Sequence, residues 1–186
     1  LQTLGSPPIR NMGTIGGNIC TASPAGDTLP PLYVLAAEVE LHGKAGIRRV
    51  PLHQFITGPG QTLLGAGEIL TGIRIRKPPG VNHQRFTKVG QRQALACCIA
   101  SLAALLEISA AGVVEAARLA WGSVGPTVVT SSAAEAALTG AVLSRESLDQ
   151  AAVFARRDVA PIDDIRASAA YRREVAGNLL LRLLPE

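Results

Sequence analysis

The sequence contains few aromatic residues and few cysteines. Phe, Trp and Tyr together make up 3% of its 186 residues, and there are three cysteines. Proteins that bind nucleic acids use aromatic side chains as stacking platforms beside basic residues, so the shortage of aromatics argues against a nucleic-acid partner. Cys20 and the adjacent Cys97 and Cys98 provide neither a disulfide framework nor a metal-ligand spacing. This usage favours a reducing cytoplasm and predicts no metal site.

Long apolar runs are also missing. Hydrophobic residues make up 47% of the chain, but Gly, Pro and charged residues interrupt every run before it reaches the roughly 20 residues of a membrane span. The first residues, LQTLG, have neither the basic nor the apolar region of a signal peptide. We therefore expect a soluble globular protein with no membrane span. The three histidines are isolated from one another, and we expect surface or packing roles for them.

Acidic residues are scarce in the first half of the chain. Residues 1–93 contain ten Lys and Arg against four Asp and Glu, whereas residues 94–186 contain eight against ten. A basic half indicates an anionic partner. Because the basic residues occur as scattered pairs, nucleic acid is disfavoured. A small ligand that carries phosphate is the class of partner that remains.

Strong turn signals divide the chain at about residue 78. The run KPPG occupies residues 77–80 and interrupts both helices and strands. We therefore predict two domains, residues 1–78 and residues 79–186. In the first we expect a short helix capped by Asp27 or Thr28, a β-hairpin over residues 38–50, a helical turn over 52–56 and a strand over 68–75.

The second part is predicted to begin with strands and to end with helices. The Ala- and Leu-rich run 94–108 fits either a helix or a buried strand, because its periodicity does not separate the two. The elements predicted together give an α+β fold class. The other expected elements are strands over 84–89, 113–122 and 126–130 and helices over 133–138, 145–157 and 168–184.

A glycine-rich polar segment near the start combines several groups that bind ligands. GTIGGN, at residues 13–18, is not the G-x-G-x-x-G pattern and follows no predicted strand. We expect a turn on a loop, in which adjacent glycines allow positive φ and let a ligand approach the backbone. Asp27 follows closely; a carboxylate disfavours a nest built for phosphate alone but suits ribose or ribityl hydroxyls. From the spacing alone, a turn whose polar side chains bond their own backbone is the simpler interpretation.

Four longer segments resemble a known family. They are IRNMGTIGGNICTASPAGDTLP, LHQFITGPGQTLLGAGEILTGIRIRKPP, RFTKVGQRQALA and PIDDIRASAAYRREVAGNLLLRLL. In this order and spacing they resemble the FAD-binding medium subunit of molybdenum hydroxylases, the family of xanthine dehydrogenase and carbon monoxide dehydrogenase. The resemblance covers essentially the whole chain. It implies the second part of an FAD-binding domain of the vanillyl-alcohol-oxidase type, followed by a sheet-plus-helices domain of the CO dehydrogenase flavoprotein type.

The resemblance also implies which residues bind FAD. It implies that Thr14 and the glycine backbone contact the cofactor, that Asp27 contacts the flavin nucleotide and that Leu70 packs on it. Lys88 is implied to lie beside the flavin, where an ammonium group stabilises negative charge on the reduced ring. Taken alone, Lys88 also fits a solvated strand lysine. The implied cofactor-binding residues are Thr14, Ile15, Gly16, Gly17, Asn18, Ser23, Asp27, Leu70 and Lys88, with no catalytic or metal-binding residue.

The function implied is that of an oxidoreductase component. It would pass electrons from iron–sulfur clusters through FAD to an acceptor such as NAD, oxygen or a quinone, with an iron–sulfur subunit and a molybdopterin subunit as partners. Family members carry an earlier subdomain with an A-G-G-T-like loop for the FAD pyrophosphate, and residues 1–10 do not supply it. We therefore expect a fragment that binds FAD weakly or not at all alone. Two alternatives stay open: a subunit-docking module with a vestigial or incomplete flavin site, and an independent flavin enzyme.

Overall fold

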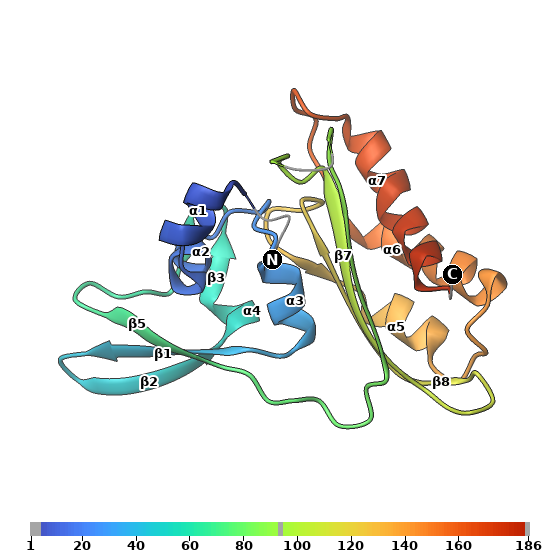
Figure 1. Ribbon diagram of the computed structural model, residues 1–186, viewed down its shortest axis with the longest axis horizontal. Coiled ribbons are helices and arrows are strands. Elements are labelled where there is room, and N and C mark those ends of the chain that lie inside the picture. Colours follow the sequence, from blue (N-terminus) through green and yellow to red (C-terminus); the bar gives the residue numbers. More distant parts are fainter. Residues whose placement is uncertain (1–4, 93–94, 185–186) are drawn as a thin grey trace.

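Short helices lie above a small sheet in the first part of the chain, in the view of Figure 1. The computed structural model describes residues 5–92 and 95–184. The small sheet is antiparallel with strand order β2–β1–β5, and β3 pairs with β4 beside it. The elements of this first part are α1 (Pro7–Met12), α2 (Ile15–Thr21), α3 (Leu29–Val34), β1 (Glu38–Gly43), β2 (Gly46–Pro51), α4 (Leu52–Phe55), β3 (Ile56–Gly58), β4 (Gln61–Thr62) and β5 (Ile69–Arg74).

A larger antiparallel sheet with strand order β6–β7–β8–β9 dominates the second part. Helices α5, α6 and α7 cover one face of this sheet, on the right of Figure 1. The elements are β6 (His83–Val89), β7 (Ala100–Ile108), β8 (Val114–Gly122), β9 (Val129–Thr130), α5 (Ser132–Leu138), α6 (Arg145–Asp158), α7 (Ala169–Asn178) and a 3₁₀ helix (Leu179–Leu183).

Strand β7 settles the Ala- and Leu-rich run that fitted either a helix or a strand. Leu102 and Leu106 pack into the cluster beneath helices α5 to α7, whereas Ala103 and Leu105 pack into the cluster that contains α3. Because both faces of β7 are buried, almost every position is apolar and no alternation marks the strand. Residue 94, the first of the run, lies outside the described residues.

Most of the predicted elements are present, with shifted ends. The structure confirms the hairpin, the α+β class and three of the predicted strands, which correspond to β5, β6 and β8. Strand β9 is shorter than the strand predicted over 126–130. The single helix predicted over 168–184 was wrong in its second half, because α7 ends at Asn178 and a 3₁₀ helix follows. Within residues 5–92 and 95–184, no helix combines the length and apolar character needed to cross a membrane.

Helix α3 packs the first part of the chain against the larger sheet. It contacts β7 and β8 on the face opposite α5 to α7. Gly122 permits this approach, since a Cβ atom there would lie 2.8 Å from Cγ of Pro30. The Ser123 amide also donates to the Pro24 carbonyl, at 2.9 Å. The division at about residue 78 stays a prediction, and one hydrophobic cluster contains residues from both sides of it.

Candidate functional site

The glycine-rich segment begins helix α2 and does not form the predicted loop. Thr14 is the N-cap, and its Oγ1 accepts a hydrogen bond from the Gly17 amide at 2.9 Å. The expectation of a loop was wrong, and neither Gly16 nor Gly17 uses the positive φ that glycine allows. The physical reason is the cap: a threonine hydroxyl that satisfies a free helix donor stabilises the first turn enough to contain two glycines.

Gly16 brings helix α2 close to strand β5. A Cβ atom at Gly16 would lie 3.4 Å from Cδ2 of Leu70, which leaves no room for a larger side chain between the two elements. Leu70 is partly buried and packs against the core. Ile15, which directly precedes Gly16, is 46% exposed. The structure therefore places Leu70 beside the Thr14–Asn18 segment, although Asn18 and Leu70 are 52 positions apart in the sequence.

Asn18 links helix α2 to the segment that contains Asp27. The Thr28 hydroxyl donates a hydrogen bond to Oδ1 of Asn18, at 2.5 Å. Ser23 lies in the same segment, but its hydroxyl accepts from the Ala25 amide at 3.3 Å and its carbonyl accepts from the Gly26 amide at 2.9 Å. Asn18 and Asp27 are thus connected through Thr28, whereas the polar atoms of Ser23 close a turn in their own backbone.

Asp27 and Lys88 form an ion pair between the two parts of the chain. Lys88 Nζ lies 2.5 Å from Asp27 Oδ2, across a sequence separation of 61 residues. The Lys88 side chain is 20% exposed and the Asp27 side chain 11%, so this is not a solvated strand lysine. The second carboxylate oxygen, Asp27 Oδ1, is buried and has no hydrogen-bond partner among the described residues. Asp27 Oδ1 can therefore accept a hydrogen bond from a further donor.

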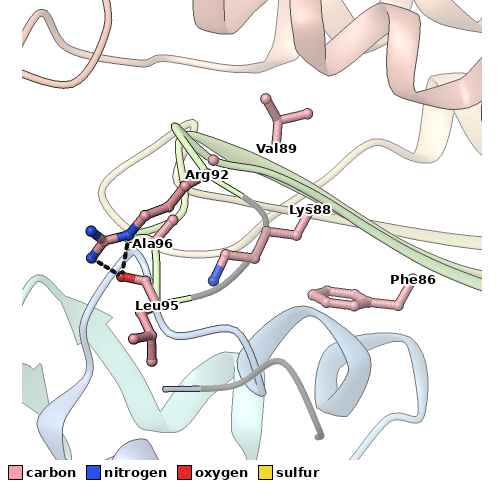
Figure 2. A pocket seen from close by; sticks show the side chains of 7 residues that line it. Phe86, Lys88, Val89, Arg92, Leu95 and Ala96 are labelled. Atoms are coloured by element: carbon pink, nitrogen blue, oxygen red, sulfur yellow. Dashed lines mark hydrogen bonds between the residues drawn. The ribbon is translucent and has the colours of Figure 1, made fainter. Parts of the chain in front are cut away.

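An open pocket of about 550 Å³ lies beside Lys88 at the end of β6. Figure 2 shows the Lys88 side chain extending between Leu95 and the ring of Phe86. Arg92 closes one side by donating from Nε and Nη2 to the Leu95 carbonyl, at 3.2 and 2.6 Å. The pocket thus combines apolar surfaces with one ammonium group. The residues that line it are Phe86, Lys88, Val89, Gly90, Arg92, Leu95 and Ala96.

Two buried residues beneath this region were missed by the sequence analysis. Burial raises the pKa of the Cys98 thiol above its ordinary value, and this thiol is close enough to Asp27 and Lys88 to sense both charges. Arg172 is 3% exposed and reaches the same region from α7. A signal for Arg172 was present, because it precedes buried Ala176 by four positions and buried Leu179 by seven, which places it on the apolar face of its helix.

The arrangement fits the cofactor that the resemblance implied. A buried carboxylate oxygen without a partner is costly unless a donor reaches it, and the hydroxyls of a ribityl or ribose group are such donors. The pocket offers Phe86 and Leu95 to a flat ring and the Lys88 ammonium to negative charge on that ring. The chemistry of Asp27, Lys88 and the pocket therefore suits FAD.

Comparisons with known proteins identify both parts of the chain. Residues 1–78 match the family model described as the FAD binding domain in molybdopterin dehydrogenase, and residues 85–186 match the CO dehydrogenase flavoprotein C-terminal domain. The nicotinate dehydrogenase FAD-subunit of Eubacterium barkeri is 32% identical over 183 residues, which are 97% of this chain and 62% of that protein. The carbon monoxide dehydrogenase medium chain of Afipia carboxidovorans is 34% identical over 96% of this chain and 62% of its own length.

Solved structures agree with these sequence matches. A chain of the Cu,Mo-CO dehydrogenase in its cyanide-inactivated form superimposes with a TM-score of 0.91 at 33% identity, covering 97% of this chain and 63% of that one. The chain thus spans less than two thirds of the length of these relatives. It belongs to the family of FAD-binding medium subunits of xanthine and carbon monoxide dehydrogenases, whose cofactor is FAD.

Proposed function

We propose that this chain is the FAD-carrying component of a molybdenum hydroxylase that passes electrons from iron–sulfur clusters through FAD to an acceptor. The observation that supports the proposal most directly is the Asp27–Lys88 pair: Lys88 lines an open pocket, and Asp27 Oδ1 is buried with no hydrogen-bond partner among the described residues. Its partners would be an iron–sulfur subunit and a molybdopterin subunit, and its acceptor NAD, oxygen or a quinone. A cytoplasmic location also stays a prediction.

The residues of this chain would bind and orient the cofactor. Asp27 would accept hydrogen bonds from sugar or ribityl hydroxyls, while Leu70 and the backbone of Thr14 to Gly17 would form an apolar and polar wall at the α2–β5 contact. When bound, FAD would supply the oxidation–reduction chemistry. Lys88 would hold positive charge beside the pocket and so favour the more negative form of a bound ring. Its pairing with Asp27 fixes the position of that charge.

A titration with FAD tests the proposal. We expect the full-length protein to retain FAD and the Asp27→Ala variant to lose it, because the variant removes the buried acceptor. Asp149→Ala is a matched control, since Asp149 is an exposed carboxylate that pairs with Arg145 on the surface of α6. Flavin absorbance after gel filtration measures the retained cofactor. Unchanged flavin content in Asp27→Ala would overturn the assignment of Asp27.

The same titration separates the proposal from a docking module with a vestigial flavin site. We expect FAD to bind a version that includes the additional length found in the relatives, and to bind the 186-residue chain more weakly. Absence of flavin binding in both versions would favour the docking module. The unpartnered Asp27 Oδ1 argues against that alternative, because a vestigial site has no reason to keep a buried acceptor without a donor.

A further inference from the structure

Arg172 is a buried cation with three polar partners from three different segments. Its Nη1 donates to the carbonyl of Ile99 at 2.7 Å and to that of Ser123 at 3.0 Å. Its Nη2 donates to Oδ1 of Asp164 at 2.7 Å. The two carbonyls lie 73 and 49 positions from Arg172 in the sequence. One guanidinium group therefore joins the residue that precedes β7, the turn after β8 and the loop before α7.

Each of the two carbonyl partners is bonded in turn to one half of the ion pair. The Ile99 amide donates to the carbonyl of Val89 at 2.8 Å, and Val89 directly follows Lys88. The Ser123 amide donates to the carbonyl of Pro24 at 2.9 Å, and Pro24 lies in the Ser23–Gly26 turn that leads to Asp27. The backbone carrying the cation and the backbone carrying the carboxylate are thus both fixed to residues held by the same Nη1 atom.

The Ser123 turn needs such a support. Ser123 has a φ of 63°, in the left-handed region that a non-glycine residue adopts at a cost in energy. A conformation of this kind persists where surrounding contacts determine it. For Ser123 these contacts are the bond from Arg172 to its carbonyl and the bond from its own amide to Pro24. Loss of the first bond would free the turn to relax and to move the Pro24 segment with it.

Arg172 is itself oriented by Asp164. One Asp164 oxygen accepts from Arg172 Nη2 and from the Arg166 amide, and the other accepts from the Arg166 guanidinium at 2.7 Å. These hydrogen bonds hold the pKa of the Asp164 carboxyl well below its ordinary range, and those from Arg166 have the largest effect. The carboxylate therefore stays charged under ordinary conditions. A planar guanidinium can serve a carboxylate and two carbonyls at once, which a lysine ammonium does less well.

We propose that Arg172 is a positioning residue for the flavin site, because it sets the separation of Asp27 and Lys88 through Ser123 and Ile99. This inference rests on the proposed function, since it assigns Arg172 a role in cofactor binding beyond the stability of the fold. It does not place Arg172 in contact with the cofactor.

The test compares Arg172→Gln with Arg156→Gln in the full-length protein purified with its partners. Arg156 is a matched control, because it also anchors α7, donating to Glu174 at 3.0 Å and to Asn178 at 2.8 Å, but bonds neither Ile99 nor Ser123. The measurements are the FAD dissociation constant, the visible absorbance bands and midpoint potential of the bound flavin, and the melting temperature. We expect Arg172→Gln to raise the dissociation constant roughly tenfold or more and to shift the absorbance bands.

The control separates positioning from stability. Arg156→Gln should lower the melting temperature while leaving the dissociation constant and the flavin spectrum unchanged. If Arg172→Gln also binds FAD with wild-type affinity and spectrum, the proposal is overturned. If Arg172→Gln does not fold, Arg172→Lys takes its place: an altered flavin spectrum supports the proposal, and a wild-type spectrum overturns it.

A failure of the proposed function would give a different result. In that case the wild-type protein would take up no FAD, and the proposal for Arg172 would be judged from amide hydrogen exchange. Faster exchange of the Ile99 and Ser123 amides in the Arg172 variant, with Arg156→Gln unchanged at these two amides, would support the link to Val89 and Pro24. Unchanged exchange at both amides would overturn it.

Discussion

The two side-chain oxygens of Asp27 have different surroundings. Oδ2 accepts the Lys88 ammonium, while Oδ1 is buried with no partner among the described residues. A buried charge depends on its counter-ion, since removing one member of such a pair leaves the other without compensation. The stability of the chain should therefore depend on this pair more than on its exposed ion pairs.

Lys88→Met should destabilise the chain by about 2–3 kcal/mol, because the Asp27 side chain, which is 11% exposed, would lose the one charged partner that it has among residues 5–92 and 95–184. The Asp27→Asn/Lys88→Met double variant should recover part of this loss. Urea unfolding of the wild type, both single variants and the double variant gives the coupling energy between the two side chains.

Arg49→Met, Glu40→Gln and their double variant form the matched control cycle. Arg49 pairs with Glu40 at 3.1 Å, and its side chain is 53% exposed. An exposed pair of this kind is worth about 0.5 kcal/mol. A coupling energy between Asp27 and Lys88 no larger than that of Arg49 and Glu40 would show that solvent screens the buried pair as well.

The residues of the site differ in how far the sequence could predict them. Asp27 and Lys88 are 61 positions apart, and no spacing rule joins them; the family resemblance selected both, and the fold brings them together. Ser23 was selected in the same way, but its polar atoms serve its own turn. Arg172 was missed because a charged residue on a helix is ordinarily solvated, and burial of this one depends on partners from three distant segments.

Helix α2 shows how an element can differ from the prediction made from its glycines. Two adjacent glycines favour a turn, yet both lie in the first turn of a helix whose cap is Thr14. A Cβ at Gly16 would meet Leu70 of β5 at 3.4 Å, and one at Gly17 would meet Oγ1 of Thr14 at 3.0 Å. The glycines are therefore adapted to close contacts in a helix, which local sequence rules do not describe.

Alanine substitutions at the two glycines should have opposite effects on stability. Gly16→Ala should be neutral or stabilise the chain by up to about 0.5 kcal/mol, because alanine lowers the entropy of the unfolded chain and meets Leu70 at an ordinary contact distance. Gly17→Ala should cost about 1 kcal/mol, because its methyl group would displace the capping hydroxyl of Thr14. Thermal unfolding of the two variants measures the difference.

The Gly16 variant also tests where the cofactor lies. If the α2–β5 contact forms part of the flavin site, Gly16→Ala should weaken FAD binding in the full-length protein although it does not lower stability. Equal losses of stability in the two glycine variants would contradict the close contact of Gly17 with the cap.

Strand β7 marks the limit of sequence periodicity at the scale of an element. Its neighbours β6 and β8 have exposed positions, but β7 is covered by α5 to α7 on one face and by α3 on the other. A strand buried on both faces has the composition of a buried helix. The choice depends on the packing of segments distant in sequence, so it could not be made from residues 94–108 alone.

The whole molecule is held together by a core that crosses from the first part of the chain to the second. One hydrophobic cluster includes Leu32 and Val39 from the first part and Ala103, Leu105 and Ala120 from the larger sheet. The small side chains at 103 and 120 let α3 lie close to the sheet. Two parts that share buried surface in this way are expected to unfold together.

We therefore expect one cooperative unfolding transition. Trp121, the single tryptophan, is fully buried in the second part and reports through its fluorescence, while amide exchange of β1 reports on the first part. Both signals should be lost at the same urea concentration. Gly122→Ala, whose methyl group would lie 2.8 Å from Pro30, should lower both midpoints together. Two separated transitions in the wild type would show that the parts unfold independently.

The order of Asp27, Lys88 and Arg172 in the sequence has a consequence for biosynthesis. Asp27 and Lys88 are made before α7, because Arg172 lies 84 positions after Lys88 in the sequence. The ribosome adds roughly 5–20 residues per second, and domains fold as units during this synthesis. At that rate of synthesis, Arg172 is made several seconds after both members of the ion pair, so its bonds to the Ile99 and Ser123 carbonyls can form only after Asp27 and Lys88 have been made.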